Sequence, residues 1–85
     1  MRTIISDHAR DRLRQVYGRD AGIMEARAKV GLRSTLRCGA KVSRDLRIYV
    51  WLPSDVRAVW ALSQDAWICT TALRPRHAKE GGRAA

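Results

Sequence analysis

Hydrophobic residues near the N-terminus recur every three or four positions, the spacing that places side chains on one face of an α-helix. Ala9, Leu13 and Val16 follow this spacing. Gly18 comes directly after the last helical position, where glycine commonly ends a helix. The pattern therefore predicts a helix over residues 7–17.

A second helix is expected to begin after Asp20, whose side chain can cap a first turn. Ile23, Ala26 and Val30 recur at helical spacing, so we expect these three residues to form the core-facing side of that helix. Gly31 is expected to mark its end, because glycine in the interior of a helix is unfavourable.

In the second half of the chain, apolar residues alternate with polar or aromatic ones, which is the period-two pattern of a β-strand. The alternation is clear in residues 46–52, 56–62 and 66–73, which are separated by short turns. A weaker strand is expected at residues 34–38, and residues 2–5 are suited to a short edge strand. Successive strands joined by short turns predict antiparallel pairing.

These elements predict an α+β fold in which two N-terminal helices pack on a three- to four-stranded antiparallel sheet. The fold is expected to form a single domain over residues 1–75, followed by a basic flexible tail over residues 76–85. Two helices cannot cover both faces of such a sheet, so one face should be partly open. Trp60 and Trp67 occupy core positions in the pattern, whereas Trp51 alternates with the apolar residues and should lie on the opposite face.

The net charge of the chain indicates what kind of partner the domain binds, because a strongly positive surface favours polyanions. The 85 residues include 17 Lys and Arg against 8 Asp and Glu, a net charge of +9, and most of the basic residues are arginine. Each phosphate contact releases a counterion, and guanidinium binds phosphate through two parallel hydrogen bonds. Nucleic acid, or a nucleoprotein complex, is therefore the expected class of partner.

Cysteine content and hydropathy bear on the cellular location of the protein and on its use of metals and membranes. Cys38 and Cys69 are too few for a disulfide framework or a zinc site. The N-terminus has no apolar stretch of signal-peptide length, and no segment approaches a membrane span. We therefore expect a cytoplasmic protein that uses no metal, no cofactor and no membrane partner.

The candidate binding residues are arginines and the aromatic residues that interleave with them on residues 46–52. Arg47 and Tyr49 share one face of that strand, and Arg57 can lie across from them on the next strand. A basic strand face with interleaved rings suits binding of RNA or DNA. The full candidate set for nucleic-acid or partner binding is Arg10, Arg12, Arg14, Arg44, Arg47, Tyr49, Trp51, Arg57, Arg74 and Arg76.

Catalysis is left open, because no complete catalytic motif occurs in the sequence. Metal-free RNA cleavage needs a base for the 2′-hydroxyl, an acid for the leaving oxygen, and cations for the charge of the transition state. The candidate catalytic residues are Arg47, Tyr49 and His8, with His77 as a further acid or base in the tail. The same residues also suit nucleic-acid binding without any reaction.

A short motif on the first helix resembles the start of short phage and prophage proteins that open with a DHAxxR-type pattern. The matching positions are Asp7, His8, Ala9, Arg12, Tyr17, Gly18 and Asp20. The order of elements over residues 3–73 also distantly resembles the RelE and BrnT type of bacterial toxin. That resemblance implies a RelE/BrnT-like fold and, for RelE-like toxins, ribonuclease activity with active residues on the sheet and near the C-terminus. This chain has no matching cluster of basic residues with Tyr or His at its end.

Two hypotheses about function follow. The first is a small, basic, toxin-like protein that binds RNA, with ribonuclease activity left open and an antitoxin among its expected partners. The alternative is a non-enzymatic phage accessory or anti-defence inhibitor, similar to an anti-CRISPR protein, that binds a host protein or nucleoprotein complex in the host cytoplasm. A DNA-binding regulator ranks last, because the chain lacks the all-helical pattern of a helix-turn-helix domain.

Overall fold

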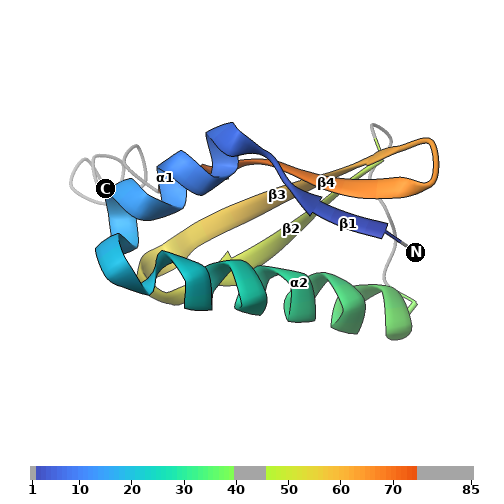
Figure 1. The fold of residues 1–85 in the computed structure, drawn as a ribbon. Coiled ribbons are helices and arrows are strands. Elements are labelled where there is room, and N and C mark those ends of the chain that lie inside the picture. Colours follow the sequence, from blue (N-terminus) through green and yellow to red (C-terminus); the bar gives the residue numbers. More distant parts are fainter. Residues whose placement is uncertain (1, 40–45, 75–85) are drawn as a thin grey trace, which may run out of the picture.

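A computed structural model describes residues 2–39 and 46–74 of the chain, and the tail expected at residues 76–85 lies outside them. The chain has the α+β class that its sequence predicts (Figure 1). Its elements are β1 (Arg2–Ile5), α1 (Asp7–Tyr17), the 3₁₀ turn η1 (Gly18–Asp20), α2 (Ala21–Arg37), β2 (Arg47–Leu52), the 3₁₀ turn η2 (Pro53–Asp55), β3 (Val56–Ser63) and β4 (Ala66–Leu73).

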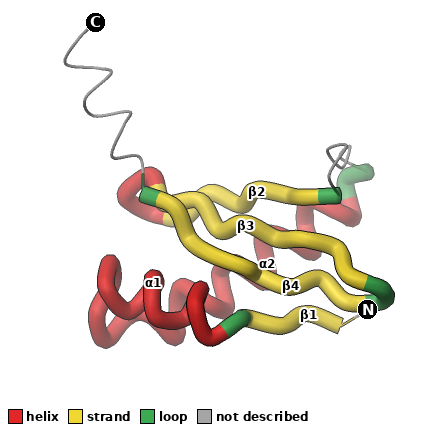
Figure 2. The backbone as a smooth tube through the Cα atoms, turned by 90° about the horizontal axis from the view of Figure 1, so that it is seen from above, coloured by secondary structure: helices red, strands yellow, loops and turns green. Residues whose placement is uncertain are grey.

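The sheet is mixed, so the prediction of a wholly antiparallel sheet is wrong. Its four strands lie in the order β1-β4-β3-β2, as seen in Figure 2. β2, β3 and β4 form antiparallel pairs, whereas β1 runs parallel to β4. A short turn forces its two strands to be antiparallel, but no such turn joins β1 to β4. Alternation along the sequence predicts strands, and it carries no information about the direction of a strand that pairs across such a distance.

Helix α1 has the range that the sequence predicts, and its ends show why. Ser6 caps the helix, because its Oγ accepts a hydrogen bond from the Ala9 N–H at 3.1 Å. Gly18 follows the last turn with φ +60°, a backbone conformation that glycine adopts easily. Ala9 and Leu13 are fully buried, so the predicted apolar face does contact the core.

Helix α1 also covers the edge of β4 beyond the end of the short strand β1. Ser6 N–H donates to Cys69 O at 3.0 Å, and Ser6 Oγ donates to Thr70 O at 3.2 Å. One helical turn and a half further on, Arg12 Nε donates to Ala72 O at 3.3 Å. These contacts satisfy carbonyl groups that a longer β1 would otherwise have bonded. The part of β4 beyond β1 is therefore covered by Ser6 and Arg12.

Helix α2 continues through Gly31 to Arg37, so the predicted end at Gly31 and the weak strand at residues 34–38 are both wrong. Leu32 lies one turn beyond Ala28 on the same face and keeps the helix against the core. Gly31 is needed for a different reason. A Cβ atom built at this position would lie closer to the Val50 side chain than van der Waals contact permits. Gly31 thus marks a close approach between α2 and β2.

The buried face of α2 is not the one that the sequence predicts. Ala28 and Leu32 are fully buried, whereas Ile23 is 58% exposed and Val30 is 60% exposed. Ala26 is exposed as well. Alanine and glycine on the inner face let the helix approach the sheet closely, and the larger β-branched residues then remain on its outer side. Hydrophobicity alone favours Ile and Val as core residues and cannot reveal this preference for small side chains.

The core lies between the helices and one face of the sheet. Its largest fully buried side chains are Trp60, Leu13, Leu32, Val56 and Cys69. Figure 2 shows the other face of the sheet without a helix over it, in agreement with the expectation of an open face. Within residues 2–39 and 46–74, no helix is both long and apolar enough to cross a membrane.

The two cysteines should differ sharply in reactivity. Cys38 is exposed, whereas Cys69 is fully buried, and burial raises the pKa of its thiol to about 11. Because only the thiolate is nucleophilic, Cys69 should stay unmodified in the folded protein. We expect an alkylating reagent at neutral pH to add one label to the native protein and two in denaturant, counted by mass spectrometry. Two labels under native conditions would contradict this placement of Cys69.

Candidate nucleic-acid interface

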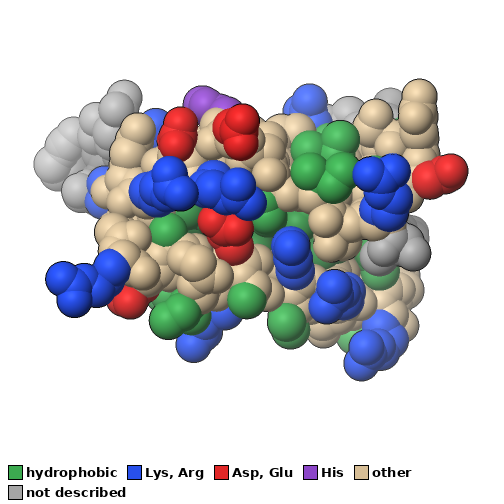
Figure 3. Space-filling model, viewed as in Figure 1, with side chains coloured by type: hydrophobic (Ala, Val, Ile, Leu, Met, Phe, Trp, Pro, Cys, Tyr) green, Lys and Arg blue, Asp and Glu red, His purple; other side chains and the backbone are tan. Residues whose placement is uncertain are grey.

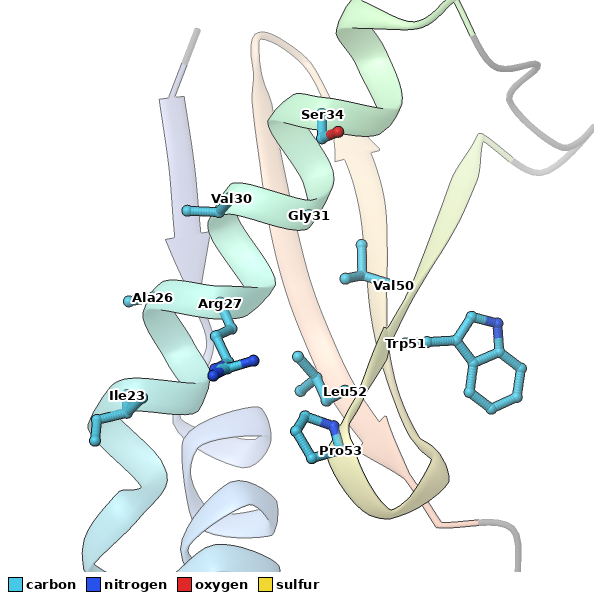
Figure 4. Close-up of a pocket in the computed structure, with 10 residues that line it drawn as sticks. All are labelled: Ile23, Ala26, Arg27, Val30, Gly31, Ser34, Val50, Trp51, Leu52 and Pro53. Atoms are coloured by element: carbon cyan, nitrogen blue, oxygen red, sulfur yellow. The ribbon is translucent and has the colours of Figure 1, made fainter.

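The alternation of β2 places its polar and aromatic residues on the open face of the sheet. Exposed and buried residues alternate without interruption from Arg47 to Leu52. Tyr49 is 42% exposed and Trp51 is 63% exposed. In the close-up of Figure 4, the Trp51 ring points away from α2, whereas Val50 lies on the side of the helix. The predicted outward position of Trp51 is therefore confirmed.

Arg57 joins the two rings from the neighbouring strand. In the β2–β3 register it lies opposite Trp51, while Tyr49 lies opposite Val59. The Arg57 guanidinium carbon is 5.4 Å from the centroid of the Trp51 ring and 5.5 Å from that of Tyr49. Both distances are within the range of a cation–π interaction. We call Tyr49, Trp51 and Arg57 the open-face cluster.

The open-face cluster combines two binding properties in one place. Contact with both rings reduces the freedom that Arg57 has left to lose when it binds a ligand. Its N–H groups remain the natural donors for a phosphate. Trp51 keeps most of its surface exposed despite this contact, so the ring can still stack on a base. Stacking and phosphate binding together are what a single-stranded nucleic acid requires.

Further basic residues lie at both ends of this face. Leu73 pairs with Arg57 in the β3–β4 register, and the exposed Arg74 follows it directly at the same end of the sheet. Arg47 is exposed at the start of β2. Arg47 therefore extends the basic surface along β2, and Arg74 lies just beyond the end of β4.

The arginines of helix α1 have mostly structural partners. Arg10 pairs with Glu25 of α2, with 3.0 Å between Nε and Oε2, and this hydrogen bond and charge raise the pKa of Arg10. Arg12 bonds the edge of β4, as described above. Arg14 is exposed and lies only 3.9 Å from Asp11. Two of these three candidate binding residues, Arg10 and Arg12, thus hold the helices in place. Their spacing along the sequence could not reveal this role.

Basic side chains on the helical side of the molecule do not form one compact patch. Figure 3 shows Lys and Arg dispersed over this side, with hydrophobic and acidic side chains between them. A dispersed charge of this kind favours polyanions in general without selecting a binding site. The open-face cluster is distinguished by its rings and by the contact of Arg57 with both of them.

His8 is not brought to the open-face cluster. It is exposed at the start of α1, which packs along β4, and β3 separates β4 from the strand of Tyr49. Adjacent strands are about 5 Å apart, so β4 and β2 are about 10 Å apart, well beyond the reach of a direct hydrogen bond. The candidate catalytic residues His8 and Tyr49 thus do not share a site. Arg44, Arg76 and His77 lie outside the described residues.

A second surface feature was not expected from the sequence. It is a groove of about 490 Å³ between α2 and β2, shown in Figure 4. Its lining residues are Ile23, Ala26, Arg27, Val30, Gly31, Ser34, Val50, Trp51, Leu52 and Pro53. The signal in the sequence is the apolar spacing of Ile23, Ala26 and Val30, which also predicts a core-facing side of the helix.

Within residues 2–39 and 46–74, no cluster of three or more His, Cys, Asp or Glu side chains could hold a metal ion. Comparisons of the chain with protein-family models, curated proteins and solved structures gave no match.

Proposed function

We propose that this protein binds single-stranded RNA through the open face of its sheet and that binding does not depend on cleavage. The observation that carries the proposal is the contact of Arg57 with the rings of both Tyr49 and Trp51. The net charge of +9 supplies the long-range attraction. A toxin-like role on a RelE/BrnT-like scaffold remains a prediction from the resemblance of the sequence.

The preference for single strands follows from the chemistry of the cluster. Base faces are hidden in a duplex but accessible in a single strand, and stacking on one aromatic side chain contributes about 1–3 kcal/mol. Arg57 can bind a phosphate next to a base that stacks on Trp51. Arg47 lies on the same strand as both rings, so it is on the path of a nucleic-acid strand that follows β2.

Replacing Trp51 with alanine should weaken the binding of a single-stranded oligoribonucleotide about 10- to 100-fold, because one stacking platform is lost.

Arg57→Ala should weaken binding about tenfold and flatten the dependence of log affinity on log salt by about one unit, because one phosphate contact disappears. Both effects are measured by fluorescence anisotropy of a labelled oligoribonucleotide at several salt concentrations.

Arg33→Ala is the matched control, because Arg33 is exposed on α2, in the helical layer, and its loss changes the net charge by the same amount. We expect it to weaken binding less than about threefold, through long-range charge alone. Equal losses for Arg33→Ala and Arg57→Ala would contradict a defined site on the open face. Duplex RNA and single-stranded DNA of the same sequence test the proposed preference.

The absence of cleavage is tested in the same samples. Among the described residues, Tyr49 has no histidine beside it to complete an acid–base pair, so the RNA should stay intact on a denaturing gel. Cleavage that Tyr49→Phe abolishes would instead support the ribonuclease version of the hypothesis.

A protein partner is the second candidate, and one observation favours it. Trp, Tyr and Arg are the residue types most enriched in the energetic hot spots of protein interfaces, and the open-face cluster consists of these three. An open face that binds no nucleic acid even at low salt would favour the inhibitor hypothesis over RNA binding.

A further inference from the structure

The two edges of the sheet are protected to different degrees. At one edge the last strand is β1, which has only 4 residues, and beyond its end Ser6 and Arg12 cover the backbone of β4. At the other edge, β2 is the last strand, and its pairing with β3 runs from Arg47 to Leu52 without a register shift. A straight edge strand of this kind is a template for a further strand, unless charge, proline or a bulge prevents it.

The register shows which backbone groups of β2 face outward. Leu46 O accepts a hydrogen bond from Leu62 N–H at 3.0 Å, and antiparallel pairs alternate along a ladder. The N–H and C=O groups of Tyr49 and Trp51 therefore point away from β3. They lie at the position where an added strand would form hydrogen bonds.

The groove between α2 and β2 lies beside this edge and supplies side-chain contacts. Val50 and Leu52 form the wall on β2, and Ile23 and Val30 are exposed on α2. Arg27 is the one charged residue among the ten that line the groove, and it extends into the space between α2 and β2 in Figure 4. None of the lining residues is acidic.

The charge of α2 indicates whether a second copy of the chain or an acidic partner would bind in this groove. Arg27, Arg33 and Arg37 are exposed on the helix, whereas Glu25, its one acidic residue, is already paired with Arg10. A second copy of the chain would bring two such basic helices together, and like charges at an interface are unfavourable. An acidic occupant would meet a complementary surface.

We propose that the groove binds an extended, acidic segment of a partner protein, which adds a fifth strand to the sheet beside β2. The backbone of the segment bonds the edge at Tyr49 and Trp51. Alternate side chains face the groove, where a carboxylate pairs with Arg27 and apolar side chains contact Val50 and Leu52. This mode of binding gives affinity through main-chain hydrogen bonds and specificity through alternate side chains. The site is distinct from the phosphate-binding position at Arg57.

The probe is a fluorescein-labelled peptide of about ten residues, within the usual length of a strand. Every second residue faces the groove, and these positions are valine and glutamate in turn, with threonine at the positions between them. We expect saturable binding that weakens about tenfold in Arg27→Glu, because an attraction becomes a repulsion. Arg33→Glu, with the same change in charge on the same helix, should weaken binding less than about threefold. The same peptide methylated on the backbone nitrogens that would face β2 should not bind, because it cannot pair with the strand. Bound peptide should also slow hydrogen exchange at the amides of Tyr49 and Trp51.

Three results would overturn the proposal. The first is no binding of the peptide at about 1 mM. The second is equal loss in Arg27→Glu and Arg33→Glu, which would indicate general charge attraction. The third is a concentration-dependent dimer in sedimentation, with the Tyr49 and Trp51 amides already protected without peptide, which would assign the edge to a second copy. RNA affinity should fall no more in Arg27→Glu than in Arg33→Glu, because both change only the long-range charge that the RNA meets, so this test and the test of RNA binding fail independently.

Discussion

Replacing Leu32 with alanine should destabilise the protein by about 2–5 kcal/mol, whereas Val30→Ala should cost less than about 0.5 kcal/mol. The two residues are two positions apart on α2, but Leu32 is fully buried and Val30 is 60% exposed. Removing the Leu32 side chain leaves a cavity beneath the helix, in contact with the sheet. Removing two methyl groups from an exposed helical residue leaves no cavity, and alanine is the better helix former.

Urea denaturation followed by circular dichroism measures both changes in the free energy of unfolding. Domains of this size have total stabilities of about 5–15 kcal/mol, so Leu32→Ala removes a large part of the available stability. The two variants lie on one helix and lose similar volumes, which makes Val30→Ala a close control. A larger loss for Val30→Ala than for Leu32→Ala would place Ile23 and Val30 in the core, as the spacing along the sequence predicts.

The second large effect is expected at Gly31. Gly31→Ala should destabilise the fold by about 1–3 kcal/mol, although alanine is favoured over glycine in a helix by about 1 kcal/mol. The added methyl group would overlap the side chain of Val50, which is buried and β-branched, and therefore cannot rotate freely out of the way. The close approach of α2 to β2 decides the sign of the effect.

Two variants separate packing from helix propensity in that experiment. Gly22 also lies in α2, but a Cβ at Gly22 would meet nothing within 4 Å, so Gly22→Ala should stabilise by about 0.5–1 kcal/mol. In a Val50→Ala background, the cost of Gly31→Ala should disappear. Destabilisation that persists without the Val50 side chain would contradict the proposed contact.

The sequence predicts local structure in this protein better than it predicts packing. Alternation along β2 correctly separates Ile48, Val50 and Leu52 from the exposed residues between them, because strand periodicity depends only on neighbouring positions. The limits of α1 follow from Ser6 and Gly18, which act on the adjacent turn. Each of these features is set by interactions within a few residues.

The predictions are wrong where contacts between segments far apart in the sequence determine the structure. Gly31 looks like a helix end, and only the position of Val50 on another element explains it as a close contact. Arg12 looks like a free cation, but its partner is a carbonyl group 60 residues later in the chain. The parallel direction of β1 likewise depends on β4, at the far end of the described chain.

The candidate site was predictable in part for the same reason. The outward positions of Tyr49 and Trp51 follow from alternation, and Arg57 was expected on the neighbouring strand. The contact of Arg57 with both rings depends on the β2–β3 register. The groove beside α2 depends on which face of that helix is buried, so the sequence could not reveal it.

The most direct test of RNA binding by the open face is the NMR spectrum of the tryptophan indole N–H groups during a titration with single-stranded RNA. The chain has three tryptophans, of which Trp51 is 63% exposed while Trp60 and Trp67 are buried at 0% and 4% exposure. We expect the Trp51 signal, identified by its absence in Trp51→Phe, to shift progressively with added RNA, with the signals of Trp60 and Trp67 nearly unchanged. RNA binding that leaves the Trp51 signal in place would contradict a binding site on the open face.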